Sequence, residues 1–140
     1  MQEGKDTILI IEDERPLSQA LDDKFTREGF KTLVAKNGEE GLDVALREHP
    51  DLILLDIVMP VMDGMTMLKR LREDAWGKDA IVIMLTNLTD NERVADAITE
   101  GSHDYLVKSN WKIEDVVKKV REKLHPAAQE VLAARSGGSI

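Results

Sequence analysis

A short apolar run that ends in a single carboxylate constrains the fold of this chain more than any other stretch. Residues 52–55 (Leu-Ile-Leu-Leu) lead into Asp56, and the turn signals Met59-Pro60 and Asp63-Gly64 follow. An unbroken apolar run bounded by turn residues is typical of a strand buried on both faces of a parallel sheet. Open parallel sheets bind ligands at the carboxyl ends of their strands, which is where this pattern places Asp56. Taken alone, Asp56 is also an ordinary residue for a strand-to-helix turn.

The rest of the chain alternates between apolar runs and apolar residues at helical spacing. Further strands are predicted at residues 7–11, 31–35, 80–85 and 105–107. Five helices are predicted from the stripes Leu17, Ala20, Leu21, Lys24 and Phe25; Leu42, Ala45 and Leu46; Met65, Leu68 and Leu71; Val94, Ala97 and Ile98; and Ile113, Val116, Val117, Val120 and Leu124. Capping boxes are indicated at Asn37 with Glu40 and at Thr89 with Glu92, and residues 74–79 indicate a polar loop. This alternation predicts an α/β fold with right-handed parallel crossovers.

Composition and charge narrow the class of protein. The chain is 42% hydrophobic and 33% charged, which is typical of a folded globular domain. No apolar run approaches the roughly 18–20 residues that a transmembrane helix needs. Because cysteine is absent and the N-terminus is polar, we expect a cytoplasmic protein that does not insert into membranes. The net charge of -8 argues against direct binding to nucleic acid and suits cations or basic partners.

Four of the predicted strands end in polar residues that suit phosphoryl chemistry. The first delivers Glu12 and Asp13, the third Asp56, the fourth Thr86 and the fifth Lys108. These ends share one edge of a parallel sheet, where clustered carboxylates favour a hard cation such as Mg²⁺. Asp56 is suited to attack phosphorus, with Lys108 and Thr86 binding phosphoryl oxygens. Singly, such residues are common as helix-terminus charges, caps or solvated lysines, but their coincidence at one edge favours a site.

The motifs around these residues resemble the receiver domain of two-component response regulators. The matching segments are Ile10-Ile11-Glu12-Asp13-Glu14, residues 51–56 with Met59-Pro60 and Asp63-Gly64, Met84-Leu85-Thr86, and residues 101–108. The resemblance covers residues 6–125 and implies a flavodoxin-like, doubly wound five-stranded parallel sheet, order 2-1-3-4-5, with five helices. Residues 126–140 are then expected to be a C-terminal tail or linker.

The resemblance also implies a function. Asp56 would accept a phosphoryl group from the phosphohistidine of a sensor histidine kinase or a phosphotransfer protein. Mg²⁺ would be held by Glu12, Asp13, Asp56 and the backbone carbonyl of Val58. The chain would be a signalling phosphoacceptor that catalyses only its own phosphorylation and dephosphorylation.

A switch pair and an output surface are implied in the same way. Thr86 would move toward the phosphoryl group while Tyr105 turns inward. This change would repack the surface of the fourth helix, fifth strand and fifth helix, where a downstream protein or a second copy would bind. Because no DNA-binding module follows Lys123, we expect output through protein contact.

Two departures from the family pattern bear on the site. The family usually has a cis-proline after the lysine, whereas this chain has Ser109. Since a cis bond without proline costs about 2.5–4 kcal/mol, we expect a trans Lys108–Ser109 bond or a rebuilt loop. Val58 and Leu88, two residues beyond the acceptor and the threonine, are apolar and cannot orient a hydrolytic water. We therefore expect slow self-dephosphorylation.

Three alternatives stay open at this point. The chain could be the receiver part of a longer regulator with an output domain, or a non-phosphorylated binding module of the same fold. It could also be a phosphohydrolase, although that class usually carries a second aspartate where this chain has Val58. The histidines are expected at loop or solvent-facing positions, namely His49, His103 and His125. The methionines are expected in core and loop packing, namely Met59, Met62, Met65 and Met67. Trp111 is left open between packing and partner contact.

Overall fold

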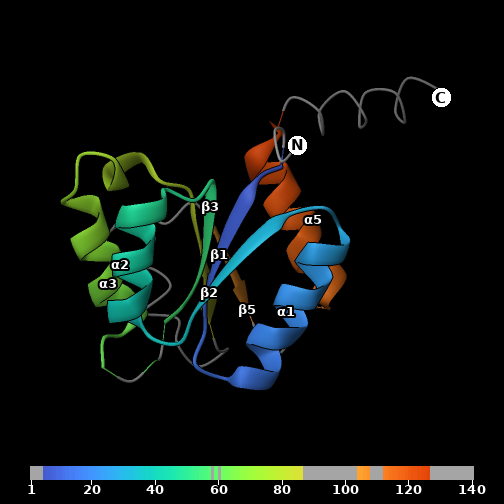
Figure 1. Ribbon diagram of the computed structural model, residues 1–140, viewed down its shortest axis with the longest axis horizontal. Helices are drawn as coiled ribbons and strands as arrows, with labels where there is room; N and C mark the ends of the chain where they lie inside the picture. The colour runs from blue at the N-terminus through green and yellow to red at the C-terminus, as the bar shows by residue number, and fades with distance from the viewer. Residues whose placement is uncertain (1–4, 58, 60, 87–103, 108–111, 127–140) are drawn as a thin grey trace.

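The computed structural model describes residues 5–57, 59, 61–86, 104–107 and 112–126, the side chains of Thr86 and residues 104–107 excepted (Figure 1). Its elements are β1 (Thr7–Ile11), α1 (Arg15–Arg27), β2 (Lys31–Ala35), α2 (Gly38–Glu48), β3 (Leu52–Asp56), α3 (Gly64–Arg72), the 3-10 helix η1 (Gly77–Asp79), β4 (Val82–Thr86), β5 (Asp104–Val107) and α5 (Ile113–Leu124). The predicted helix around Val94 and its cap at Thr89 lie outside the described residues.

One parallel sheet organises the fold, with the strand order β2-β1-β3-β4-β5. Leu54 of β3 pairs with Ile10 on one side and Ile83 on the other, so β3 is the central strand. Every residue of β3 is buried. The order confirms the flavodoxin-like arrangement, and Asp56 is the last residue of its strand, as predicted.

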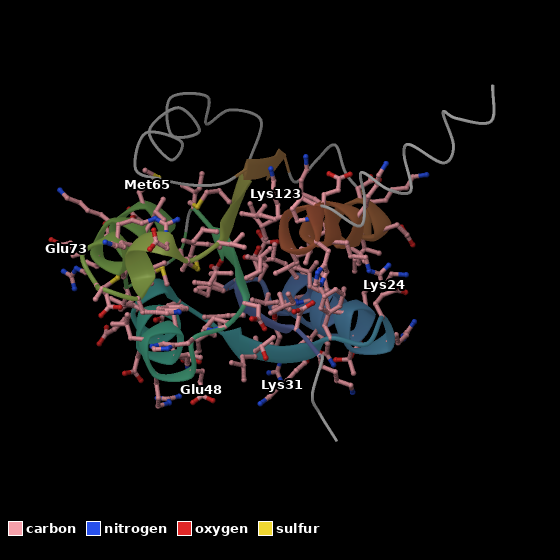
Figure 2. All side chains as sticks on the ribbon, turned by 90° about the horizontal axis from the view of Figure 1, so that it is seen from above. Lys24, Lys31, Glu48, Met65, Glu73 and Lys123 are labelled. Carbon is pink, nitrogen blue, oxygen red and sulfur yellow. The ribbon has the colours of Figure 1, made fainter. Side chains whose placement is uncertain are left out.

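Helices cover both faces of this sheet. Figure 1 shows α2 and α3 on one face and α1 and α5 on the other, and Figure 2 shows the same layers from above. Side chains of β3 alternate between two apolar clusters: Ile53 and Leu55 pack toward α2 and α3, and Leu52 and Leu54 toward α1 and α5. Because both faces are covered, the sequence of β3 shows no alternation of apolar and polar residues.

The contact face of α2 differs from the prediction. Ala45 is buried as predicted, but Leu46 is 37% exposed. Gly38 and Gly41 are buried instead, because the helix lies so near the sheet that a Cβ on Gly41 would be 2.4 Å from Cδ1 of Ile11. Apolar spacing indicates large side chains and therefore does not detect a glycine contact.

Helix α1 also buries a residue that the pattern did not indicate. Leu21 and Phe25 are buried as predicted, whereas Ala20 is exposed and Ser18 is buried. The hydroxyl of Ser18 donates to the backbone oxygen of Arg15 at 3.1 Å, which satisfies this polar group locally.

The connection between α3 and β4 is more ordered than the predicted polar loop. Asp74 accepts hydrogen bonds from the backbone N–H groups of Trp76 and Gly77, each at 2.9 Å. Arg72 donates to the backbone oxygens of Gly77 and Ala80, which encloses η1. Strand β4 therefore begins at Val82, two residues later than predicted, and ends at Thr86.

Other predicted positions agree where the structure describes them. His49 and His125 are exposed, and the ring of His49 stacks on Trp76 with centroids 4.3 Å apart. Met59 and Met67 are buried, and Met62 and Met65 pack against the same cluster. His103 and Trp111 lie outside the described residues. None of the described helices has both the length and the apolar character needed to cross a bilayer.

Candidate functional site

Three carboxylates meet at the carboxyl end of the sheet. Glu12 and Asp13 follow β1, and Asp56 ends β3, the neighbouring strand. Ile11 pairs with Leu55, so the residues that follow each of them emerge side by side. One carboxylate oxygen from each of the three acids lies within 4.8 Å of the other two. The structure thus brings together the acids that the sequence placed at this edge.

Burial differs among the three acids. Glu12 is 1% exposed and Asp56 is 4% exposed, whereas Asp13 is exposed. Glu12 is held by its backbone N–H, which donates to the oxygen of Ala35 at 3.1 Å, and by its side chain, which accepts from the N–H of Glu14 at 3.2 Å. Removing carboxylates from water is unfavourable unless a positive group or hydrogen bonds compensate them. The arrangement therefore favours a cation at this point.

The chemistry of the donors fits a hard divalent cation. All three side chains offer oxygen, which is the ligand type that Mg²⁺ takes in proteins. Mg²⁺ usually retains several waters and uses one or two carboxylates together with phosphate oxygens. Because Asp13 is exposed, the cluster is open to solvent on that side and has access to such further ligands.

The segment after Asp56 is fixed at both ends. The N–H of Ile57 donates to the oxygen of Leu85 at 3.1 Å, and the oxygen of Ile57 accepts from Gly64 at 2.8 Å. At the far end, Asp63 caps α3 by accepting from the N–H of Thr66 at 2.8 Å. The oxygen of Met62 accepts from the N–H of Gly38 in α2 at 3.1 Å. The sequence had indicated a cap at Asn37 and a turn at Asp63-Gly64, and the side chain of Asn37 does accept from the N–H of Glu40. It gave no sign of the contact between Gly38 and Met62.

The other predicted site residues are described only in part. Thr86 ends β4, the strand next to β3, so its backbone lies at the same edge as Asp56. Tyr105 lies in β5 and pairs with Met84. The remaining predicted positions lie outside the described residues, namely Val58, Leu88, Lys108 and Ser109. Their roles, and those of Thr86 and Tyr105, stay predictions.

Comparison with protein families identifies the class of this fold and site. Residues 8–121 match the family model described as the response regulator receiver domain. This match covers most of the chain, and the chain therefore belongs to the response regulator receiver domain family.

A curated relative is considerably longer than this chain. The chain is 35% identical over 138 residues to the probable transcriptional regulator ycf27 of Porphyridium aerugineum. The match covers 95% of this chain and 55% of the relative. The chain thus spans about half the length of the curated relatives it matches.

Solved structures of the same class superpose closely. A CheY-like receiver domain protein from Methanospirillum hungatei has a TM-score of 0.81 at 25% identity, covering 91% of this chain and 99% of the other. The CheX-CheY-BeF3-Mg²⁺ complex from Borrelia burgdorferi matches with a TM-score of 0.75 at 32% identity, covering 83% of this chain and 87% of that one. These likenesses agree with the strand order found here.

Proposed function

We propose that this chain is the phosphoacceptor of a two-component phosphorelay, with Asp56 as the acceptor. One observation carries the proposal: a 4% exposed Asp56 ends the central strand with the carboxylates of Glu12 and Asp13 beside it. Membership of the receiver family supports this assignment. The donor would be the phosphohistidine of a histidine kinase or phosphotransfer protein.

The transfer is a displacement at phosphorus. A carboxylate oxygen of Asp56 forms a bond to phosphorus while the bond between phosphorus and the donor imidazole nitrogen breaks, and that nitrogen keeps the electron pair. Strand β3 holds the nucleophile in place, because residues 52–55 are fully buried. We propose that Lys108 and the Thr86 hydroxyl bind the phosphoryl oxygens as charge develops on them.

We assign Mg²⁺ to the side chains of Glu12, Asp13 and Asp56 with the backbone carbonyl of Val58. When bound, Mg²⁺ supplies positive charge that offsets the carboxylates and the phosphoryl oxygens. The Borrelia burgdorferi neighbour is a CheX–CheY complex that contains BeF3 and Mg²⁺, which supports such a site in this fold. The described acids of this chain fit the assignment because all of them offer oxygen ligands.

Output is proposed to pass through the surface of the fourth helix, β5 and α5. Thr86 and Tyr105 would act as the switch pair, and a downstream protein or a second copy would bind there. We place the receiver domain at residues 6–125, the tail at residues 126–140 and the protein in the cytoplasm. The length of the curated relatives favours one alternative, that the chain is the receiver part of a longer regulator.

Incubation with acetyl phosphate and Mg²⁺ tests the proposal. Intact mass should rise by one phosphoryl group in the wild-type protein and in Asp23→Ala, a control in which an exposed aspartate of α1 is removed. Asp56→Ala should show no gain in mass, and omission of Mg²⁺ should suppress the gain in the wild-type protein and in Asp23→Ala. A wild-type protein that stays unmodified would instead support a binding module. Sustained phosphate release during steady-state turnover would indicate a phosphohydrolase.

A further inference from the structure

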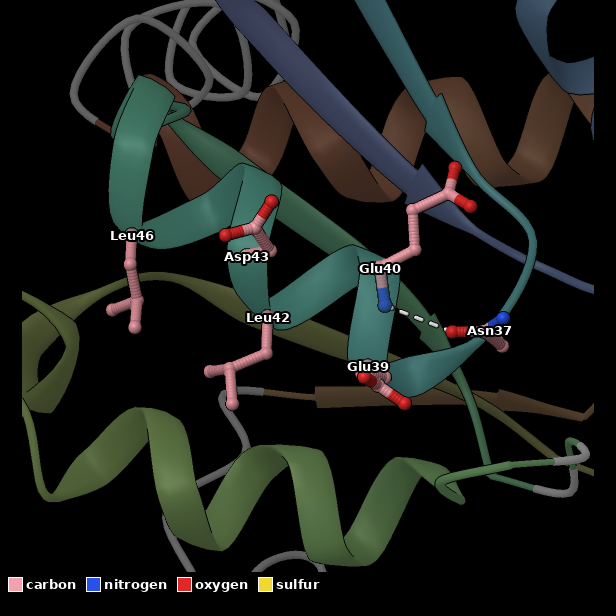
Figure 3. Close-up of a pocket in the computed structure, with 6 residues that line it drawn as sticks. All are labelled: Asn37, Glu39, Glu40, Leu42, Asp43 and Leu46. Carbon is pink, nitrogen blue, oxygen red and sulfur yellow. Dashed lines mark hydrogen bonds between the residues drawn. The ribbon is translucent and has the colours of Figure 1, made fainter.

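The start of α2 contacts the loop that joins β3 to α3 (residues 57–63), although the two segments are distant in sequence. The N–H of Gly38, the first residue of α2, donates to the backbone oxygen of Met62 at 3.1 Å. The first turn of α2 is itself fixed, because the side chain of Asn37 accepts from the N–H of Glu40 at 2.8 Å (Figure 3). The loop is therefore bonded to a helix terminus that a cap already holds.

This contact leaves no room for a side chain at residue 38. A Cβ built on Gly38 would lie 2.3 Å from the oxygen of Met62 and 3.0 Å from its carbonyl carbon. Among the described glycines only Gly29 has a positive φ, so Gly38 does not occupy the left-handed region. Glycine is required at residue 38 for space and not for an unusual backbone conformation.

A short chain of contacts leads from Met62 to Asp56. Asp63 is fixed as the cap of α3, and the next residue, Gly64, donates to the oxygen of Ile57. A Cβ on Gly64 would lie 2.2 Å from the backbone oxygen of Asp56, so this glycine packs directly on the candidate acceptor. Tight packing of backbone on backbone transmits a displacement because there are no voids to absorb it.

The loop conformation is imposed by these surroundings. Val61 has a φ of 69° and is 74% exposed. A β-branched residue is unfavourable in the left-handed region, and it persists there only where neighbouring structure determines the backbone. The bonds at Met62 and Gly64 on either side of Asp63 provide that determination.

We infer that Gly38 is a positioning residue for Asp56, acting from α2 through Met62 and Gly64. The inference rests on the proposed function of Asp56. A side chain at residue 38 would displace the backbone of Met62, and through Gly64 it would displace the acceptor Asp56. The bare backbone of Gly38 thus contributes to the site without contacting the phosphoryl group.

Gly38→Ala tests this inference. Alanine is more favourable than glycine within a helix, so any loss arises from the loop contact and not from helix formation. Since a misplacement of about 1 Å can slow a reaction about 100-fold, we expect phosphorylation by acetyl phosphate to slow by roughly tenfold to 100-fold. The Mg²⁺ midpoint is the Mg²⁺ concentration at half-saturation, followed by the methyl NMR signals of Met59 and Met62. It should rise by about tenfold, because disturbed support of metal ligands typically weakens binding on that scale. The methyl signals themselves should shift before Mg²⁺ is added.

Gly77→Ala is the matched control. A Cβ on Gly77 would lie 2.1 Å from the backbone oxygen of Leu71, a clash as severe as that at Gly38. Gly77 belongs to η1, which precedes β4 and therefore lies at the opposite end of the sheet from Asp56. We expect this variant to lose stability in thermal unfolding while keeping the wild-type methyl signals, Mg²⁺ midpoint and phosphorylation rate of the folded protein.

Two results would overturn the inference. One is a Gly38→Ala protein with the wild-type rate and Mg²⁺ midpoint, and the other is an equal loss in both glycine variants, which would reflect general instability. If the wild-type protein takes up no phosphoryl group, the proposed function fails on its own. The methyl shifts and Mg²⁺ midpoints of the three proteins would still decide whether Gly38 positions the loop.

Discussion

The two faces of the sheet are stabilised in different ways. On the face covered by α1 and α5, large side chains dominate: Phe25 is fully buried and lies edge-on to Phe30, with ring centroids 5.3 Å apart. On the face covered by α2 and α3, the glycines Gly38 and Gly64 let backbone approach backbone. Apolar burial has no preferred direction, whereas a hydrogen bond such as that from Gly38 to Met62 sets the position of the backbone. The second face is the one that holds the loop beside Asp56.

The helix starts show the same contrast. Asn37 and Asp63 each accept a backbone hydrogen bond at the start of α2 and α3. Glu14, at the corresponding position of α1, makes no side-chain cap hydrogen bond. At the start of α5 the bond runs in the other direction, from the N–H of Lys112 to the side chain of Asp115 at 2.9 Å. We therefore expect substitutions on the α1–α5 face to change stability, and substitutions at the starts of α2 and α3 to change the site as well.

The largest expected effect on stability is that of Phe25→Ala. Removal of this fully buried ring from the α1–α5 face should lower the free energy of unfolding by about 3–5 kcal/mol, measured by urea denaturation. The Mg²⁺ midpoint of the folded fraction should not change. A changed Mg²⁺ midpoint would contradict the expectation that substitutions on the α1–α5 face affect stability and not the site.

A smaller effect is expected from Asn37→Ala. Loss of the hydrogen bond to the N–H of Glu40 should cost about 1 kcal/mol of unfolding free energy. Because Asn37 precedes Gly38, the Mg²⁺ midpoint should also rise, though less than in Gly38→Ala. Asn37→Asp, which keeps a capping oxygen, serves as the control and should retain both values. An unchanged Mg²⁺ midpoint in Asn37→Ala would mean that Gly38 positions Asp56 without help from the cap at Asn37.

The smallest effect concerns an ion pair on the α1–α5 face. Arg121 donates to Oε1 of Glu28 at 2.9 Å and lowers the pKa of this carboxyl below its ordinary 4.5, with Lys24 adding to the shift and partial desolvation opposing it. A lowered folded-state pKa means that the pair stabilises the fold above about pH 4.5 and that this contribution is lost as the pH falls through the folded-state pKa.

Glu28→Gln measures this contribution. The variant should unfold at slightly lower urea concentration than the wild-type protein at neutral pH, and the difference should shrink as the pH falls through the lowered pKa of Glu28 in the folded state. A difference that grows in acid would mean that Glu28 is not held in its charged form by Arg121.

Much of the fold was predictable because a buried strand or helix face has a recognisable local pattern of apolar residues. Residues 52–56 were placed correctly as β3, since a strand covered on both faces has no polar alternation. The start of β4 was wrong because Ala80 and Ile81 are apolar yet belong to the connection from η1. Leu46 was misplaced for a related reason: its size suggested the core, but glycine contacts set the distance between α2 and the sheet.

The three acids of the candidate site were predictable to the same degree. The sequence by itself determined that Glu12, Asp13 and Asp56 would meet, because parallel strands bring the residues after them to one edge. Only the tertiary structure decided that residue 38 has to be glycine. The distance between α2 and the backbone of Met62 depends on how two separate segments pack, and a local pattern of residue types carries no information about that distance.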